Sequence, residues 1–292
     1  MRHGVVLFSS DRGITPAQAA QAAEAAGFDC FYVPEHTHIP VRRDSPHPGT
    51  GTAELPDDRY LRTLDPWVAL SMAAAVTSRI RLGTAVALPA EHDPITLAKT
   101  VASLDHLSGG RVELGVGFGW NADELADHGV PAGRRRSVLR EYLAAMQALW
   151  SQEEASYDGE FISFGPAWAW PKPLQQPRVP ILVGAGGSEK TFGWIARCAD
   201  GWLTTPGETD LGAKVGLLHR TWAAAGREGE PRVTALAGRP DPDLLAHWAQ
   251  IGVTDVAFGM PDRSPEEVIG YLGRLAGRLG LARAESGPVP AA

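Results

Sequence analysis

Eight short apolar stretches, each followed by a segment with helical periodicity, are the feature that most constrains the fold of this 292-residue chain. Such alternation indicates βα units, which assemble into a parallel sheet. Strands are expected near Val5–Phe8, Cys30–Val33, Ile80–Leu88, Val112–Val116, Ile181–Val183, Gly201–Leu203, Arg232–Ala235 and Asp255–Phe258. Helices are expected near Pro16–Ala26, Pro66–Thr77, Pro94–Leu107, Arg135–Trp150, Glu189–Cys198, Leu211–Ala225, Pro242–Gln250 and Pro265–Leu279.

Eight βα units predict an α/β fold, a (β/α)8 TIM barrel in a single domain. A long loop, Thr37–Leu64, follows strand 2, and an insertion, Glu153–Pro180, precedes strand 5. Within the insertion, Tyr157–Phe161 is typical of a turn between two short strands. We expect the barrel domain to cover residues 1–284 and residues 285–292 to form a disordered C-terminal tail.

Charge and composition argue against several classes of partner. The net charge is −7 and there is no long basic run, so nucleic acid is not expected to bind. The chain shows neither a signal-peptide pattern nor an apolar run as long as a membrane span, which predicts a cytoplasmic protein without a membrane partner. Cys30 and Cys198 lie in apolar segments, as expected in a reducing compartment. The cluster Arg134–Arg136 is either a solvated first helical turn or an anion contact.

The fourth strand ends in a glycine-rich stretch, Arg111–Asn121. Gly115, Gly117 and Gly119 remove side chains where the backbone would otherwise block a flat ligand. Trp120 and Asn121 then supply a ring and an amide. Since active sites of such barrels form at the carboxyl ends of the strands, we expect a binding site here.

Strand 2 is followed by Pro34-Glu35-His36-Thr37-His38. A His-x-His pair could bind a metal ion, but the other ligands of a metal-dependent hydrolase are missing, and no metal is expected. We interpret Glu35 and His36 as projecting into the barrel mouth, where a histidine can exchange a proton with a bound heterocycle. The alternative is a histidine that only holds the loop in place.

Two further segments favour a planar cofactor that carries a phosphate. Gly83, Thr84 and Ala85 place small groups in strand 3, either to make room for a planar ligand or to accommodate a larger neighbour. The turn Gly184–Ser188 opens directly onto a helix, where backbone N–H groups and the helix dipole favour phosphate. Its alternative is plain helix capping by Ser188.

Several motifs in one order resemble the bacterial luciferase-like monooxygenase family, and more closely its actinobacterial branch that uses the deazaflavin coenzyme F420. They are Leu82–Val86, Asp93–Lys99, Leu104–Val112, Gly115–Asn121 and Ala199–Trp202, with Pro171–Pro173 and Ile251–Val256 also fitting. The resemblance implies a TIM barrel that binds F420 or FMN at its mouth, often as a homodimer.

The resemblance also assigns roles to residues. It implies a non-prolyl cis bulge at Thr84-Ala85-Val86 and matches His36 to the family's histidine. The implied cofactor contacts are His36, Thr84, Ala85, Val86, Gly117, Gly119 and Asn121 around the ring, and Ala185, Gly186, Gly187 and Ser188 at the phosphate. Trp120 stands where a related sugar-phosphate dehydrogenase has a proton-donating carboxylate, so that enzyme's chemistry is not expected here.

Together these features predict an oxidoreductase that transfers a hydride between F420 and a small organic substrate. His36, Glu35 and Trp120 are the candidate catalytic residues, with His36 handling a proton and Trp120 forming a wall of the substrate space. The alternatives are an FMNH2-dependent monooxygenase and a non-catalytic flavin-binding barrel. The loop residues Arg42, Arg43 and Arg59 either attract the polyglutamate tail of the cofactor or pair with Asp44, Asp57 and Asp58.

Overall fold

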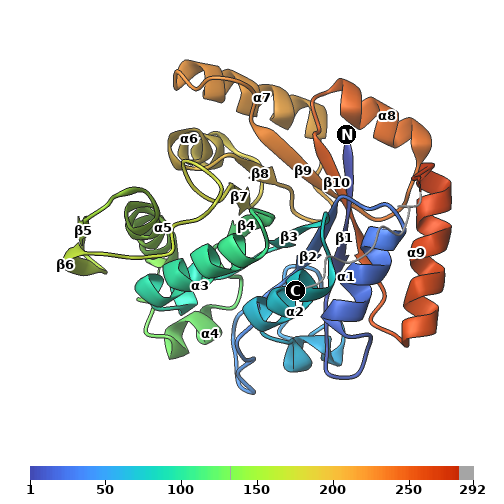
Figure 1. Cartoon of the computed structure of the whole chain (residues 1–292), viewed down its shortest axis with the longest axis horizontal. Helices are drawn as coiled ribbons and strands as arrows, with labels where there is room; N and C mark the ends of the chain where they lie inside the picture. The colour runs from blue at the N-terminus through green and yellow to red at the C-terminus, as the bar shows by residue number, and fades with distance from the viewer. Residues whose placement is uncertain (132, 283–292) are drawn as a thin grey trace.

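The computed structural model describes residues 1–131 and 133–282, and the predicted C-terminal tail lies outside them. Eight parallel strands close into a barrel in the order β1-β10-β9-β8-β7-β4-β3-β2, with helices packed around it (Figure 1). The predicted (β/α)8 barrel is confirmed. Its strands are β1 (Arg2–Leu7), β2 (Cys30–Val33), β3 (Arg81–Thr84), β4 (Val112–Gly117), β7 (Ile181–Gly184), β8 (Gly201–Leu203), β9 (Arg232–Ala237) and β10 (Asp255–Met260).

The predicted helices begin and end within two residues of their expected positions, and most of them begin at a side-chain cap. Thr15 caps the first helix and Ser264 the last, and each forms a capping box with the residue three positions on. The helices are α1 (Pro16–Ala25), α2 (Pro66–Val76), α3 (Pro94–Leu107), α4 (Ala122–Asp127), α5 (Arg135–Ser151), α6 (Glu189–Cys198), α7 (Leu211–Ala224), α8 (Pro242–Gln250) and α9 (Pro265–Leu279), with the 3₁₀ turns η1 (Asp58–Arg62) and η2 (Pro89–Glu91). Of these, α4 and the two short turns were not predicted.

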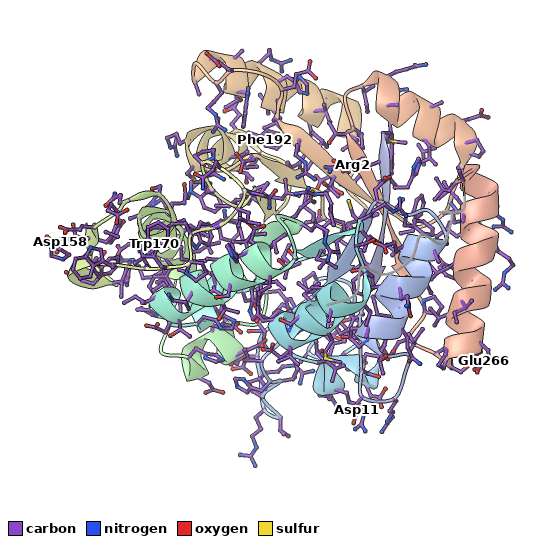
Figure 2. All side chains as sticks on the ribbon, in the orientation of Figure 1. Arg2, Asp11, Asp158, Trp170, Phe192 and Glu266 are labelled. Carbon is purple, nitrogen blue, oxygen red and sulfur yellow. The ribbon has the colours of Figure 1, made fainter. Side chains whose placement is uncertain are left out.

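The insertion before the fifth barrel strand forms the expected hairpin. Its strands β5 (Ala155–Asp158) and β6 (Ser163–Ala167) pair in antiparallel fashion. The hairpin projects from the barrel beside α5, on the side opposite α9 (Figure 1). Figure 2 shows Asp158 on this hairpin and Trp170 nearer the barrel, with Glu266 on the other side of the molecule.

The third strand is shorter than predicted. The regular ladder of β3 stops at Thr84, although the apolar run continues to Leu88. Pairing with the fourth strand resumes at Ala87, which bridges Val116. Between them the Ala85–Val86 peptide bond is cis. The apolar run alone could not show where the chain leaves the ladder.

The amino-terminal end of the barrel is closed by a buried carboxylate, Glu113, whose side chain is fully buried. It accepts hydrogen bonds from the Tyr32 hydroxyl at 2.7 Å and from Arg232 at 2.9 Å, and it also pairs with Arg81 and Arg2. Although burial opposes ionisation, the arginines lower the pKa of Glu113 to about 2. This end of the barrel is therefore a stabilising ion-pair network, and the opposite end remains for the site.

The main hydrophobic core lies between the barrel and the helices, and includes Phe31, Trp202 and Phe192. The Phe192 ring meets the Trp202 ring edge-on at a centroid distance of 5.0 Å. Cys30 is buried, as predicted, whereas Cys198 is half-buried, and both are free thiols.

Candidate active site

The predicted site residues come from four neighbouring loops at the carboxyl end of the barrel. Glu35 and His36 follow β2, Ala85 and Val86 follow β3, Gly117 ends β4 and Gly119 to Asn121 follow it, and Ala185 to Ser188 follow β7. Because β2, β3, β4 and β7 are adjacent in the barrel, these segments lie side by side around one part of the mouth.

The glycines of β4 and β7 accommodate the segment that follows β3. A Cβ atom on Gly115 would lie 2.0 Å from the Thr84 carbonyl oxygen, and one on Gly117 would lie 2.4 Å from a methyl group of Val86. A Cβ atom on Gly184 would lie 2.4 Å from the other methyl group of Val86. The expectation that Gly115 leaves space for a flat ligand is therefore wrong, since the protein backbone fills that space. These glycines instead allow Ala85 and Val86 to lie across the barrel end as a shelf.

Of the two alternatives for Gly83, accommodation of a larger neighbour is the one observed. A Cβ atom there would lie 2.6 Å from the Tyr32 ring, so this glycine accommodates a large neighbour inside the barrel. The buried Thr84 hydroxyl donates to the Gly115 carbonyl at 2.7 Å. This hydrogen bond links the end of β3, just before the shelf, to β4.

His36 is held between an acid and an indole. Its Nδ1 atom lies 2.8 Å from Oε2 of Glu124, and its Nε2 atom accepts a hydrogen bond of 3.3 Å from Trp120 Nε1. The indole nitrogen can only donate, so the imidazole proton resides on Nδ1 and points to Glu124. Nε2 is therefore the unprotonated nitrogen of the ring, and in this structure its lone pair accepts from Trp120.

Two residues of the long loop after β2 extend this arrangement. His47 and Tyr60 lie against Trp120, with ring centroids 5.0 Å and 6.4 Å away, and the His47 Nε2 atom lies 2.8 Å from the Tyr60 hydroxyl. We name His36, His47, Tyr60 and Trp120 the aromatic box. Burial, then the nearby His36, lowers the pKa of His47, so its ring stays neutral near pH 7. The loop thus folds over the mouth.

Behind the aromatic box lie three buried carboxylates, Glu35, Glu91 and Glu124. Glu35 does not face the mouth: its oxygens accept from the Leu88 N–H at 2.6 Å and contact His92 Nε2 at 2.7 Å. Burial, followed by the charges of Glu124 and Glu35, raises the pKa of Glu91 to about 9. Glu91 is therefore protonated at neutral pH, which lowers the negative charge behind His36.

Asn121 is the N-cap of α4, and its Oδ1 atom accepts from the Glu124 N–H. Its amide Nδ2 atom is buried and has no hydrogen-bond partner within the described residues. A buried donor without a partner costs about 1–3 kcal/mol. An acceptor on a ligand at the mouth would remove that cost.

The turn after β7 opens onto α6 as predicted, and Ser188 also caps the helix by accepting from the Thr191 N–H at 3.2 Å. Gly186 faces open space, since a Cβ atom added there would meet no atom of the described residues within 4 Å. Gly187 N–H, however, points to Oε1 of Glu208 at 3.4 Å. Burial opposes ionisation of Glu208, but hydrogen bonds from Lys214 and Thr205 lower its pKa. An anion at this turn therefore meets a competing carboxylate.

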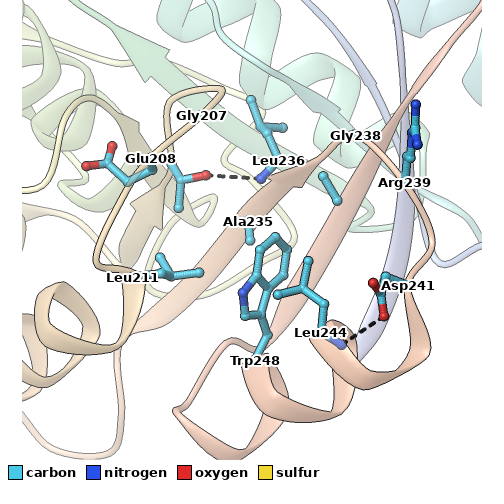
Figure 3. A pocket seen from close by; sticks show the side chains of 12 residues that line it. Gly207, Glu208, Leu211, Ala235, Leu236, Gly238, Arg239, Asp241, Leu244 and Trp248 are labelled. Carbon is cyan, nitrogen blue, oxygen red and sulfur yellow. Dashed lines mark hydrogen bonds between the residues drawn. The ribbon is translucent and has the colours of Figure 1, made fainter.

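A cavity of about 320 Å³ lies beside this turn, between α7 and α8 at the ends of β8 and β9. Figure 3 shows Leu211, Leu244 and Trp248 on its apolar side and Glu208 and Asp241 at its polar edges. No local sequence pattern indicated this cavity, because its walls come from four separate elements.

Two arginines of the long loop, Arg43 and Arg59, form contacts within the loop. Arg59 pairs with Asp57 at 2.6 Å, and Arg43 donates to the carbonyls of Pro40 and Ala53. Of the two alternatives for Arg59, pairing with a neighbouring acid is the one observed.

His36 and His38 do not converge on a common point, since His38 contacts Asp127 at 2.9 Å. Within residues 1–131 and 133–282, histidine, cysteine and acidic side chains form no group of three able to hold a metal ion. In the same part of the chain, no helix is both long enough and apolar enough to cross a membrane.

Sequence reasoning missed Glu124, His47 and Tyr60. A signal for Glu124 was present, because Asn121 followed three positions later by Glu124 is a helix-start pattern. His47 and Tyr60 lie in a loop without periodicity, and no local pattern could have placed them.

Residues 15–239 match the luciferase-like monooxygenase family, and the chain belongs to that family. An uncharacterised protein of Mycobacterium tuberculosis is 68% identical over 279 residues, which cover 96% of this chain and 99% of that protein. The F420-dependent glucose-6-phosphate dehydrogenase of Kineococcus radiotolerans is 34% identical over 217 residues, 73% of this chain and 57% of that enzyme. A monooxygenase structure from Streptomyces bottropensis has the same fold, with a TM-score of 0.77 at 19% identity over 96% of this chain and 98% of that one.

Proposed function

We propose that this protein is an oxidoreductase that transfers a hydride between coenzyme F420 and a small organic substrate. The observation that carries the proposal is the buried Nδ2 donor of Asn121, which has no partner within the described part of the chain and directly follows Trp120, the residue that contacts His36. A heterocycle with acceptor atoms resting on the Ala85–Val86 shelf fits this donor. Similarity to a relative named as F420-dependent supports the choice of F420.

When bound, the deazaflavin supplies the hydride chemistry, and the protein binds, orients and handles protons. The Ala85–Val86 shelf would support the ring. Asn121 would donate to a ring or side-chain oxygen. Gly186 and Ser188 would bind the phosphate, because Gly186 is open and the turn lies at the N-terminus of α6.

His36 is the proposed proton-handling residue. For this a substrate hydroxyl would replace the Trp120 N–H at Nε2 and give its proton to that nitrogen, and the Glu124 carboxylate at Nδ1 would stabilise the imidazolium that results. Glu124 is a positioning residue, as is Glu35, which holds the chain after β3 through Leu88 and His92. Trp120 and the other rings of the aromatic box would exclude water from the substrate.

Position 120 is a tryptophan in this chain, whereas the resemblance places a proton-donating carboxylate there in a sugar-phosphate dehydrogenase. We therefore do not propose that enzyme's reaction for this protein. We therefore propose a substrate whose hydroxyl proton is removed by His36 alone. We also propose a homodimer, which the resemblance implies, and a cytoplasmic location, which the use of cysteine favours; sedimentation of the purified protein tests the former.

The test is a titration of the apoprotein with F420 and, separately, with FMN, followed by quenching of ligand fluorescence. We expect tight, saturable binding of F420 and at least tenfold weaker binding of FMN. Tight FMN binding with none for F420 would instead identify the FMNH2-dependent monooxygenase. Binding without redox change across a broad panel of alcohols and aldehydes would identify a non-catalytic barrel.

A further inference from the structure

A second cavity, of about 70 Å³, lies outside the barrel mouth between α5, α6 and the loop after β4. We call it the basic cleft. Its lining consists of four cations and three other residues: Arg136, Arg140, Lys190, Arg197, Phe118, Thr191 and Trp194. A space of this size holds several water molecules, and so also a carboxylate or phosphate group.

The cations come from one face of each helix. Arg136 and Arg140 are four residues apart on α5, and Lys190 and Arg197 are seven apart on α6, so each pair lies along one stripe. Within residues 1–131 and 133–282, no carboxylate lies within 4.0 Å of any of these cations, although several other arginines near the mouth have such a partner. All four cations are exposed to solvent, so their charges are accessible to an anion from solution.

The three consecutive arginines Arg134–Arg136 have different contacts. Arg134 pairs with Glu160, and Arg135 donates to the Gly119 carbonyl at 2.7 Å. Arg136 turns to the cleft, where its guanidinium carbon lies 4.3 Å from the centroid of the Phe118 ring. Stacking on an aromatic face fixes a guanidinium while leaving its N–H groups free to donate.

A separate observation also indicates a ligand. Trp194 lines the cleft, is 7% exposed, and its Nε1 donor is buried without a hydrogen-bond partner in the described chain. Leaving such a donor unpaired costs about 1–3 kcal/mol. An oxygen acceptor in the cleft would satisfy it.

The position of the basic cleft suggests the ligand. Lys190 and Thr191 follow Ser188 by two and three residues, and the Ser188 hydroxyl donates to the Thr191 hydroxyl at 3.0 Å. A phosphate held at the turn before α6 would therefore have its extension beside the cleft. We propose that the basic cleft binds the carboxylate chain that extends from the cofactor's phosphate. This inference rests on the proposed function. It assigns the polyglutamate tail of F420 to the basic cleft instead of to Arg43 and Arg59.

The first test uses tetraglutamate and inorganic phosphate as probes on the protein without cofactor, followed by tryptophan fluorescence. We expect tetraglutamate to bind at least tenfold more tightly than phosphate, with an affinity that falls as salt is raised. The double variant R136Q/K190Q should lose at least tenfold in affinity. The matched control is R274Q/R278Q, which removes the same charge from α9 across the barrel (Figure 1).

Trp194→Phe isolates the role of the indole N–H. It keeps an aromatic ring and should weaken tetraglutamate binding several-fold while abolishing most of the fluorescence response. Equal affinities for both probes, or equal losses in R136Q/K190Q and R274Q/R278Q, would mean that the cleft is not a site for a carboxylate chain.

The second test compares F420 carrying several glutamates with the same deazaflavin trimmed of them. We expect the trimmed deazaflavin to bind wild-type protein about as weakly as full-length F420 binds R136Q/K190Q. Trimmed deazaflavin and R136Q/K190Q together should show no further loss of affinity. Equal binding of both forms overturns the inference and leaves the proposed function standing. Failure to bind either form overturns the proposed function, and the tetraglutamate result then decides the cleft by itself.

Discussion

The Nδ1 atom of His36 lies 2.8 Å from Oε2 of Glu124, which joins two residues that are 88 positions apart in the chain. Since Glu124 also accepts from the Thr37 N–H at 2.9 Å, one carboxylate fixes both the imidazole and the start of the long loop. The pair places the imidazole proton on Nδ1 and leaves Nε2 as the accepting nitrogen.

His36→Asn should lower kcat by about 10²–10⁴ while leaving F420 affinity within a few-fold, because it removes a proton acceptor. Glu124→Gln should cost at least about tenfold in kcat, since its one amide oxygen can accept from Nδ1–H without carrying a charge, and its NH2 group then loses the contact to the Thr37 N–H. Steady-state kinetics on both variants check this. A Glu124→Gln enzyme with wild-type kcat would show that the acid does not position the base.

Glycine substitutions test the shelf. Gly115→Ala should destabilise the protein by about 3 kcal/mol, because its Cβ would meet a backbone oxygen that cannot move aside. Gly117→Ala meets only a Val86 methyl group, so Val86→Ala should reduce its cost by about 1 kcal/mol or more. Gly186→Ala is the control and should stay within about 0.5 kcal/mol of wild type. Urea denaturation measures the free energy of unfolding of each single variant and of the Gly117→Ala/Val86→Ala double variant. Similar losses for Gly115→Ala and Gly186→Ala would contradict the proposed shelf.

Glu208→Gln should strengthen anion binding at the turn before α6. A carboxylate about 4 Å from a bound phosphate repels it by about 1 kcal/mol in a solvated site, so F420 affinity should rise about fivefold. The glutamine keeps the contacts to Gly187 and Thr205, which limits structural change. Isothermal titration calorimetry measures the affinity, and a weaker complex would show that the phosphate does not lie at this turn.

Glu91 should make stability fall with rising pH. Its pKa is about 9 in the folded protein against 4.5 for an ordinary glutamate, so the folded state holds the extra proton between these values. The stability tied to that proton is complete below pH 4.5 and is lost progressively as the pH rises to about 9. Because the linkage slope is about 1.4 kcal/mol per pH unit, Glu91→Gln should be more stable than wild type by roughly 3–5 kcal/mol at about pH 8.5 and differ little near pH 5. Thermal unfolding at both values checks this, and a variant less stable at the higher pH would indicate that Glu91 is ionised.

The barrel could be predicted from the sequence because each βα unit carries its own signal, such as proline after the Asp93 cap of α3 or the capping box at Ser264. The site was predicted only where it follows a strand directly, as at His36 and Asn121. Glu124 lies on a short helix, and the aromatic box depends on His47 and Tyr60 folding back from a long loop. Those contacts follow from tertiary packing, which local patterns do not encode.

The same limit explains the glycines of β4. The sequence showed that side chains are absent at Gly115 and Gly117, but not what fills the space. Only the packed barrel shows Thr84 and Val86 there, because the neighbour across the ladder comes from a separate βα unit.

A crystal structure of the protein with F420 tests the central claim most directly. We predict the deazaflavin ring on the Ala85–Val86 shelf, an oxygen of the cofactor within hydrogen-bond distance of Asn121 Nδ2, and the phosphate at Gly186 and Ser188. Cofactor bound instead in the cavity between α7 and α8, with Asn121 still unpaired, would contradict the account.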